Sequence, residues 1–124
     1  MKTLNLKPLS VNEVWKGRRF KTDRYKGYES LVFWNLPNIK VSSGRLAVKI
    51  LFGFSSPNAD VDNCAKPFID ILQKKYKFND KNIYDLRLSK VDVKKGDEFI
   101  SFEINPIEKV QQDLFSLADE QKYN

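Results

Sequence analysis

With 124 residues, 41% of them hydrophobic, the chain is long enough for one domain, and no apolar run approaches the roughly 20 residues of a membrane span. It contains no histidine, which excludes Ser-His-Asp and Cys-His nucleophiles, histidine general bases and zinc sites of the Cys/His kind. The net charge of +6 is uneven, because residues 1–58 hold eleven Lys or Arg against three Asp or Glu, whereas residues 59–124 hold eleven against thirteen.

The chain begins with a short predicted strand and a basic loop. Residues 2–7 alternate, with Leu4 and Leu6 on one side, and Pro8 ends this strand because proline has no backbone N–H for a sheet. Residues 10–21 indicate a loop or a ribbon. The positive charge of this region makes a polyanion its natural partner, and ordinary solubilising charge is the alternative.

Six basic side chains lie within eleven positions of the N-terminal region, with aromatic residues between them. Such a segment can follow a phosphate backbone, and its rings can stack on unpaired bases. The alternative is that the rings pack against the core, which we expect for Tyr25 more than for Trp15 or Phe20. The basic residues are Lys16, Arg18, Arg19, Lys21, Arg24 and Lys26.

A helix and a long strand follow. Thr22 is placed to cap a helix over residues 23–35, and Pro37 closes it. Residues 45–54 are mostly apolar, with β-branched and aromatic side chains, and predict a strand. Residues 55–60 then form a loop that leads into the most informative motif of the chain.

The motif ADVDNCAKPFIDIL, residues 59–72, predicts a second helix from about residue 62 to residue 76. Four-residue spacing places Asp62, Lys66 and Asp70 on one face of this helix. The side chains expected to face the core are Cys64, Phe68 and Ile71. As the only cysteine, Cys64 excludes an internal disulfide framework and fits a reducing compartment, so we expect a cytoplasmic protein.

Two carboxylates at the start of this helix admit two interpretations. In the first, Asp62 is an ordinary N-cap worth about 1 kcal/mol, and Lys66 is its ion-pair partner one turn later. This leaves Asp60 unexplained, because two close like charges repel unless a cation or a proton lies between them. In the second, the carboxylates hold a hard cation, Mg²⁺ or Mn²⁺. Asp80 is a third candidate ligand, which reaches the others only if the chain returns along the helix or if the site is completed across an interface.

The last third of the chain predicts a β-hairpin. Leu86 and Leu88 alternate in its first arm, and Val91 follows in shifted phase, as through a β-bulge. Residues 95–97 supply the turn, and the apolar side chains of residues 100–104 alternate in the second arm.

A last helix is predicted after the hairpin. Asn105 is placed to cap it and Pro106 to open it, so residues 106–124 indicate a C-terminal helical extension. Its apolar stripe consists of Ile107, Val110, Leu114 and Leu117. The order strand–helix–strand–helix–strand–strand–helix predicts a single α/β (α+β) domain over residues 1–124, with one mixed sheet packed by helices.

The combination of DVDN, the following AK and DIL, and the later NDKNIYDL resembles the RusA-type Holliday junction resolvases. The pattern of that family is Asp-x-Asp-Asn-x-x-Lys at a helix entrance, with an acidic turn after the helix. The segment PLSVNEVWKGRRFKTDRYKGYE is similar to the family's opening strand, basic loop and tyrosine-bearing helix. The resemblance covers about residues 3–105. Many members have paired aspartates in the second motif, whereas this chain has Asn79-Asp80, so Asp80 alone would carry that role.

The resemblance implies a RusA-like homodimer that uses Mg²⁺ to cut four-way DNA junctions by paired symmetric nicks, in DNA recombination and repair. Asp60, Asp62 and Asp80 would be the metal ligands and, with Lys66, the catalytic residues. Lys66 would contact the scissile phosphate or stabilise the transition state. Asn12 lies at the family's loop asparagine. The residues expected to bind DNA are Asn12, Lys16, Arg18, Arg19, Lys21 and Lys26.

Two other functions stay open. The first is a non-catalytic DNA-binding protein of recombination with the same fold. The acidic set argues against it, because a binding protein gains nothing from carboxylates that face phosphates without a metal. The second is a metal-dependent nuclease that acts on another substrate, such as flaps or RNA.

Overall fold

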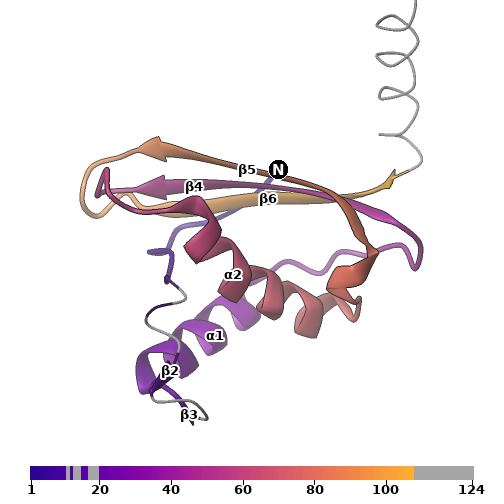
Figure 1. Ribbon diagram of the computed structural model, residues 1–124, viewed down its shortest axis with the longest axis horizontal. Helices are drawn as coiled ribbons and strands as arrows, with labels where there is room; N and C mark the ends of the chain where they lie inside the picture. Colours follow the sequence, from indigo (N-terminus) through magenta and orange to yellow (C-terminus); the bar gives the residue numbers. More distant parts are fainter. Residues whose placement is uncertain (11, 13–14, 17–19, 108–124) are drawn as a thin grey trace, which may run out of the picture.

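A four-stranded mixed sheet carries two helices on one of its faces in the computed structural model, which describes residues 1–10, 12, 15–16 and 20–107 (Figure 1). The predicted mixed α+β domain with one main sheet is confirmed. The elements are β1 (Lys2–Leu4), β2 (Trp15–Lys16), β3 (Phe20–Lys21), α1 (Asp23–Asn35), β4 (Leu46–Phe54), α2 (Val61–Tyr76), the 3₁₀ helix η2 (Asp80–Asn82), β5 (Ile83–Asp92) and β6 (Phe99–Pro106). Within the described residues, no helix has the length and apolar character needed to cross a membrane.

The strand order in the main sheet is β1-β6-β4-β5, so the predicted hairpin is wrong. β4 lies between the two supposed arms, with Ile50 opposite Phe102 of β6 in an antiparallel pair and opposite Leu88 of β5 in a parallel pair. Parallel strands need a crossover of a dozen or more residues, and α2 with η2 supplies it. The predicted turn therefore carries the chain past the end of β4, where the Val93 N–H donates to the Phe54 carbonyl at 2.8 Å.

The irregularity expected near Val91 lies at the other end of β5. The register between β4 and β5 shifts between Leu46 and Ala47, and Tyr84 is left without a partner there, whereas the rest of the strand pairs without interruption. Leu88 packs against the core, and Val91 is 42% exposed. The phase change in the sequence therefore reflects exposure at an edge strand and not a bulge.

The core lies between the sheet and the two helices (Figure 1). The rings of Phe68 of α2 and Phe102 of β6 form a T-shaped contact, with centroids 5.6 Å apart. The three side chains of α2 that were predicted to face the core, Cys64, Phe68 and Ile71, are all buried. Tyr25 is 1% exposed, which confirms the expectation that it packs inward.

Local sequence signals set the bounds of α1. The Thr22 hydroxyl accepts a hydrogen bond from the Tyr25 N–H at 3.1 Å, and the helix ends at Asn35, two residues before Pro37. Both boundaries agree with the prediction for residues 23–35. The predicted ribbon is also present, because β2 and β3 pair in an antiparallel two-stranded sheet.

The last helix does not open at Pro106 as predicted, because the helical residue that the structure describes there is Ile107, one position later. Asn105 and Pro106 belong to β6, in which Pro106 lies opposite Leu46. Ile107 is buried, and its N–H donates to the Arg45 carbonyl at 2.9 Å. The rest of the predicted extension, residues 108–124, lies outside the described part of the chain.

Glu29 joins α1 to α2. Its carboxylate accepts a hydrogen bond from the Lys74 ammonium at 2.7 Å, and the Lys21 ammonium lies 3.9 Å away. Partial burial opposes ionisation of this carboxyl, but the hydrogen bonds of Lys74 and Tyr25 and the two positive charges outweigh it and hold the pKa of Glu29 below its ordinary value.

Replacing Glu29 by glutamine is therefore expected to lower the free energy of unfolding at neutral pH by up to about 1 kcal/mol, the value of an exposed ion pair. Because the folded-state pKa is lowered, this stabilisation is fully present above the unfolded-state pKa and is lost as the pH falls through the folded-state pKa. Urea denaturation of both proteins from pH 7 down to pH 3 measures the difference. A difference that is the same at every pH would contradict the role of the charge.

Candidate functional site

Asp60 and Asp62 lie at the N-terminus of α2, but the cap position belongs to Asp60 and not to Asp62 as predicted. Asp60 occupies the N-cap position, and its side chain makes no capping hydrogen bond to the helix. Its carboxylate instead accepts a hydrogen bond from the Asn63 side-chain amide at 3.3 Å. Asp62 lies in the first turn, where its Oδ1 accepts from the Asn63 N–H at 3.0 Å. The interpretation of Asp62 as the helix cap is therefore wrong.

The loop before Asp60 is held from the edge strand. Lys90 of β5 donates hydrogen bonds from its ammonium to the Pro57 carbonyl at 3.1 Å and to the Ala59 carbonyl at 2.9 Å. β5 thus fixes the main chain immediately before the two carboxylates. Sequence reasoning missed this contact, because the parallel pairing of β4 with β5 was not foreseen.

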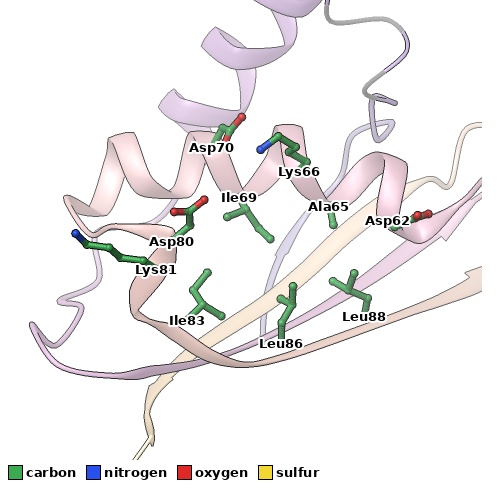
Figure 2. A pocket seen from close by; sticks show the side chains of 10 residues that line it. All are labelled: Asp62, Ala65, Lys66, Ile69, Asp70, Asp80, Lys81, Ile83, Leu86 and Leu88. Carbon is green, nitrogen blue, oxygen red and sulfur yellow. The ribbon is translucent and has the colours of Figure 1, made fainter.

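A cavity of about 530 Å³ lies between α2, η2 and β5 (Figure 2). Asp62, Lys66 and Asp70, predicted to share one helix face, all line it. Asp80 lines it from η2. The remaining lining side chains are Ala65, Ile69, Lys81, Ile83, Leu86 and Leu88. The cavity therefore combines an apolar floor with three carboxylates and two ammonium groups.

Asp80 reaches this cavity because the chain turns back beside α2. The helix ends at Tyr76, and its C-cap residue Lys77 adopts a left-handed conformation with φ of 57°. The side chain of Asn79 then accepts from the Lys81 N–H at 3.0 Å and caps η2. Finally, the Asp80 N–H donates to Gln73 Oε1 at 2.8 Å. Asp80 thus lies in the same cavity as Asp62 and Lys66 within one chain.

Gln73 connects two acidic residues of the cavity. Besides accepting from the Asp80 main chain, its side-chain amide donates to Asp70 Oδ1 at 3.4 Å and to the Ile69 carbonyl at 3.4 Å. Four-residue spacing predicted the position of Asp70 on the helix face but no role for it, and no motif indicated Gln73. The hydrogen bond between Gln73 and Asp80 forms because η2 returns along α2, and the sequence alone does not predict this return.

The donor chemistry of the cavity fits a hard cation, because its acidic ligands are all carboxylates. Their positions fit it less well. Gln73, which holds Asp80, comes eleven residues after Asp62, about 16 Å along the helix axis. Asp60 does not line the cavity. Among the described residues, no three acidic or thiol side chains gather closely enough to hold one ion.

Lys66 is exposed on α2, one turn after Asp62 and one turn before Asp70. In Figure 2 its ammonium points along the cavity wall toward Asp70. No ion pair within 4.0 Å joins it to any residue in the described part of the chain. Its charge is therefore free to meet an anion that enters the cavity.

The predicted DNA-binding residues are only partly described. Lys16 and Lys21 belong to the β2–β3 ribbon, and Lys26 is exposed on α1. Lys21 also lies 4.6 Å from the centre of the Tyr25 ring. Asn12 is exposed, and its N–H donates to the Ser10 hydroxyl at 3.2 Å. Arg18 and Arg19 lie outside the described residues.

Asp85, an acidic residue of β5, does not line the cavity. It lies opposite Ala47, and its carboxylate is 3.5 Å from Arg87 Nε on the same strand. This acid therefore serves as an internal comparison for the cavity acids.

Comparison of the chain with protein-family models and with curated protein sequences finds no match.

Proposed function

We propose that the protein is a magnesium-dependent endodeoxyribonuclease of the RusA type, which resolves four-way DNA junctions by paired symmetric nicks during recombination and repair in the cytoplasm. The observation that carries the proposal is the presence of Asp80 in the same cavity as Asp62 and Lys66. Asp80 belongs to η2, whereas Asp62 and Lys66 belong to α2. An ordinary helix cap would not require side chains of two separate segments to line one cavity. The positive charge of the first half of the chain supports a nucleic-acid substrate.

In this proposal, Asp60, Asp62 and Asp80 would hold Mg²⁺ or Mn²⁺, and the bound ion would supply a lowered pKa for water and charge neutralisation for the phosphate. Lys66 contacts the scissile phosphate, where its positive charge stabilises the additional negative charge of the transition state. The exposed ammonium of Lys26 and the ribbon residues contact neighbouring phosphates.

A homodimer is part of the proposal, because two matched nicks need two identical sites related by a two-fold axis. A dimer is also one of two arrangements that would bring the carboxylates of Asp60, Asp62 and Asp80 together. Either η2 shifts along α2 within one chain, or Asp80 of a second copy joins Asp60 and Asp62. One of these two arrangements is required by the proposal, because Gln73, which holds Asp80, lies far from Asp62 along α2.

The proposal is tested by incubating the protein with a labelled immobile four-way junction or a matched linear duplex, in Mg²⁺ or in EDTA. The expected result is symmetric nicking of the junction in Mg²⁺, no nicking in EDTA, and little cutting of the duplex. Sedimentation of the same sample should give the mass of a dimer. Equal cutting of the duplex would contradict the junction substrate, and an active monomer would contradict the dimer.

The second candidate is a non-catalytic DNA-binding protein with the same fold. It is favoured by the spacing of the carboxylates, because Asp62 and the residue that holds Asp80 lie about 16 Å apart along α2. In this case the junction is bound with the same affinity in Mg²⁺ and in EDTA, and no branched DNA or RNA is cut under either condition. Cutting of flaps or RNA, but not of four-way junctions, would instead identify a nuclease with another substrate.

A further inference from the structure

The most exposed large hydrophobic side chain of the described residues is that of Trp34, near the C-terminal end of α1. It is 77% exposed, although an indole is among the side chains with most to gain from burial. Its one described ring contact is a T-shaped contact with Phe33, with centroids 5.4 Å apart and planes at 79°. Burial in the core therefore does not account for this tryptophan.

A lysine from the other helix lies against the same two rings. The Lys75 ammonium, near the end of α2, is 4.6 Å from the centre of the Phe33 ring and 5.7 Å from that of Trp34. These distances are within the range of cation–π attraction, which holds the charge beside the rings. We call Phe33, Trp34 and Lys75 the aromatic–lysine patch. None of these residues lines the cavity that contains Asp80.

The positive charge around the aromatic–lysine patch limits the kind of partner that can bind there. Residues 74–81 contain four lysines and one acid, Asp80. Of these lysines, Lys74 is paired with Glu29, while Lys81 reaches the cavity. A second copy docked by two-fold symmetry would bring the same positive charge against this end of α2, and the two would repel. A neutral apolar partner would remove water from Lys75 without offering a counter-charge.

A nucleic-acid strand meets both requirements of the patch. An unpaired base offers a flat π face to an exposed indole, and the phosphates beside that base offer negative charge to the lysine. We propose that the aromatic–lysine patch binds single-stranded DNA by stacking an unpaired base on Trp34, with Lys75 at the adjoining phosphate. This inference rests on the proposed function in so far as the partner is DNA, but it does not depend on cleavage.

The contribution of Trp34 can be read from its own fluorescence. The chain has two tryptophans, Trp15 and Trp34, so Trp15→Phe leaves Trp34 as the only indole. Titration of this variant with an oligothymidylate in EDTA is expected to quench its emission with the same midpoint as the anisotropy of labelled DNA. Trp34→Leu should weaken binding about 10-fold or more, and Trp34→Tyr should keep most of the affinity because it keeps a stacking ring.

The contribution of Lys75 is read from salt dependence. Lys75→Gln should weaken binding and lower the slope of log affinity against log salt concentration by about 0.7, the value of one contact to a single strand. The matched control is Lys95→Gln, which removes an exposed lysine between β5 and β6, at the opposite end of the sheet from the end of α2 (Figure 1). Lys95→Gln should lower the slope of log affinity against log salt concentration by less than Lys75→Gln does.

Three results would overturn the inference. The first is saturation of the DNA without any change in Trp34 emission. The second is equal affinity for wild type and Trp34→Leu, with both shown to be folded by circular dichroism. The third is a Trp34→Leu variant that turns a dimer into a monomer in sedimentation but binds DNA normally, which would assign the patch to a second copy. A protein that quenches as expected but cuts no junction would contradict the proposed function alone.

Discussion

Replacing Asp80 by asparagine is expected to reduce metal-dependent nicking of a four-way junction by about 100-fold or more, without weakening binding of the junction in EDTA. The expected size follows from the loss of a charged group that stabilises a transition state through a metal. Asparagine has nearly the same shape, and the hydrogen bond to Gln73 uses the main-chain N–H of residue 80, so the turn should persist. Single-turnover nicking and gel-shift titration measure the two effects separately.

The matched control for this variant is Asp85→Asn. Asp85 lies three residues after Asn82, the end of η2, but outside the cavity, beside Arg87 on β5. Its replacement should leave the nicking rate within about two-fold of wild type, because surface changes away from a site have small effects. A wild-type rate in Asp80→Asn would remove Asp80 from the site, and an equal loss in both variants would point to a general effect of charge.

Mixed dimers decide which chain supplies Asp80. An Asp62→Asn chain paired with an Asp80→Asn chain has no intact set of carboxylates if each site is built within one chain. If the sites are built across the two-fold axis, the same mixed dimer has one intact site. Nicking of one strand of the junction by the mixed dimer, with neither variant active alone, would therefore place Asp80 on the partner's site.

Features with a local cause could be predicted from the sequence. Thr22 and Pro37 set the ends of α1 because capping and the missing proline N–H act over a few residues. The four-residue spacing from Asp62 to Asp70 placed three polar side chains on one face, and all of them line the cavity. The same periodicity identified the buried side of α2.

Features that depend on distant segments could not be predicted in this way. The alternation of Leu86 and Leu88 is compatible with a hairpin and with a parallel pair, and only the crossover through α2 decides between them. Pro106 follows a cap-like asparagine, but pairing with Leu46 extends the strand through it. The sequence left open whether Asp80 lies in one cavity with Asp62. It does, because Gln73 holds the main chain of Asp80, and Gln73 belongs to no recognisable motif.

Replacing Gln73 by methionine is expected to lower the turnover number for junction nicking about 10-fold, with little change in the Michaelis constant. Methionine keeps the length of the side chain but removes the hydrogen bond that ties the Asp80 N–H of η2 to α2, together with the hydrogen bond to Asp70 within α2. Their loss should cost about 1 kcal/mol in stability and leave Asp80 loosely placed, and misplacement of a catalytic group by about 1 Å costs up to 100-fold in rate. Steady-state kinetics and urea denaturation measure the two effects.

The conservative control is Gln73→Glu, which keeps an oxygen acceptor for the Asp80 N–H but loses the amide donor to Asp70. Hydrogen exchange of the Asp80 amide should be faster than wild type in Gln73→Met and close to wild type in Gln73→Glu. If positioning of Asp80 is what matters, the rate of nicking should follow this exchange and not the stability. Faster exchange in Gln73→Met with unchanged turnover would show that Gln73 holds the turn without serving the chemistry, because a purely structural contact changes the first quantity and not the second.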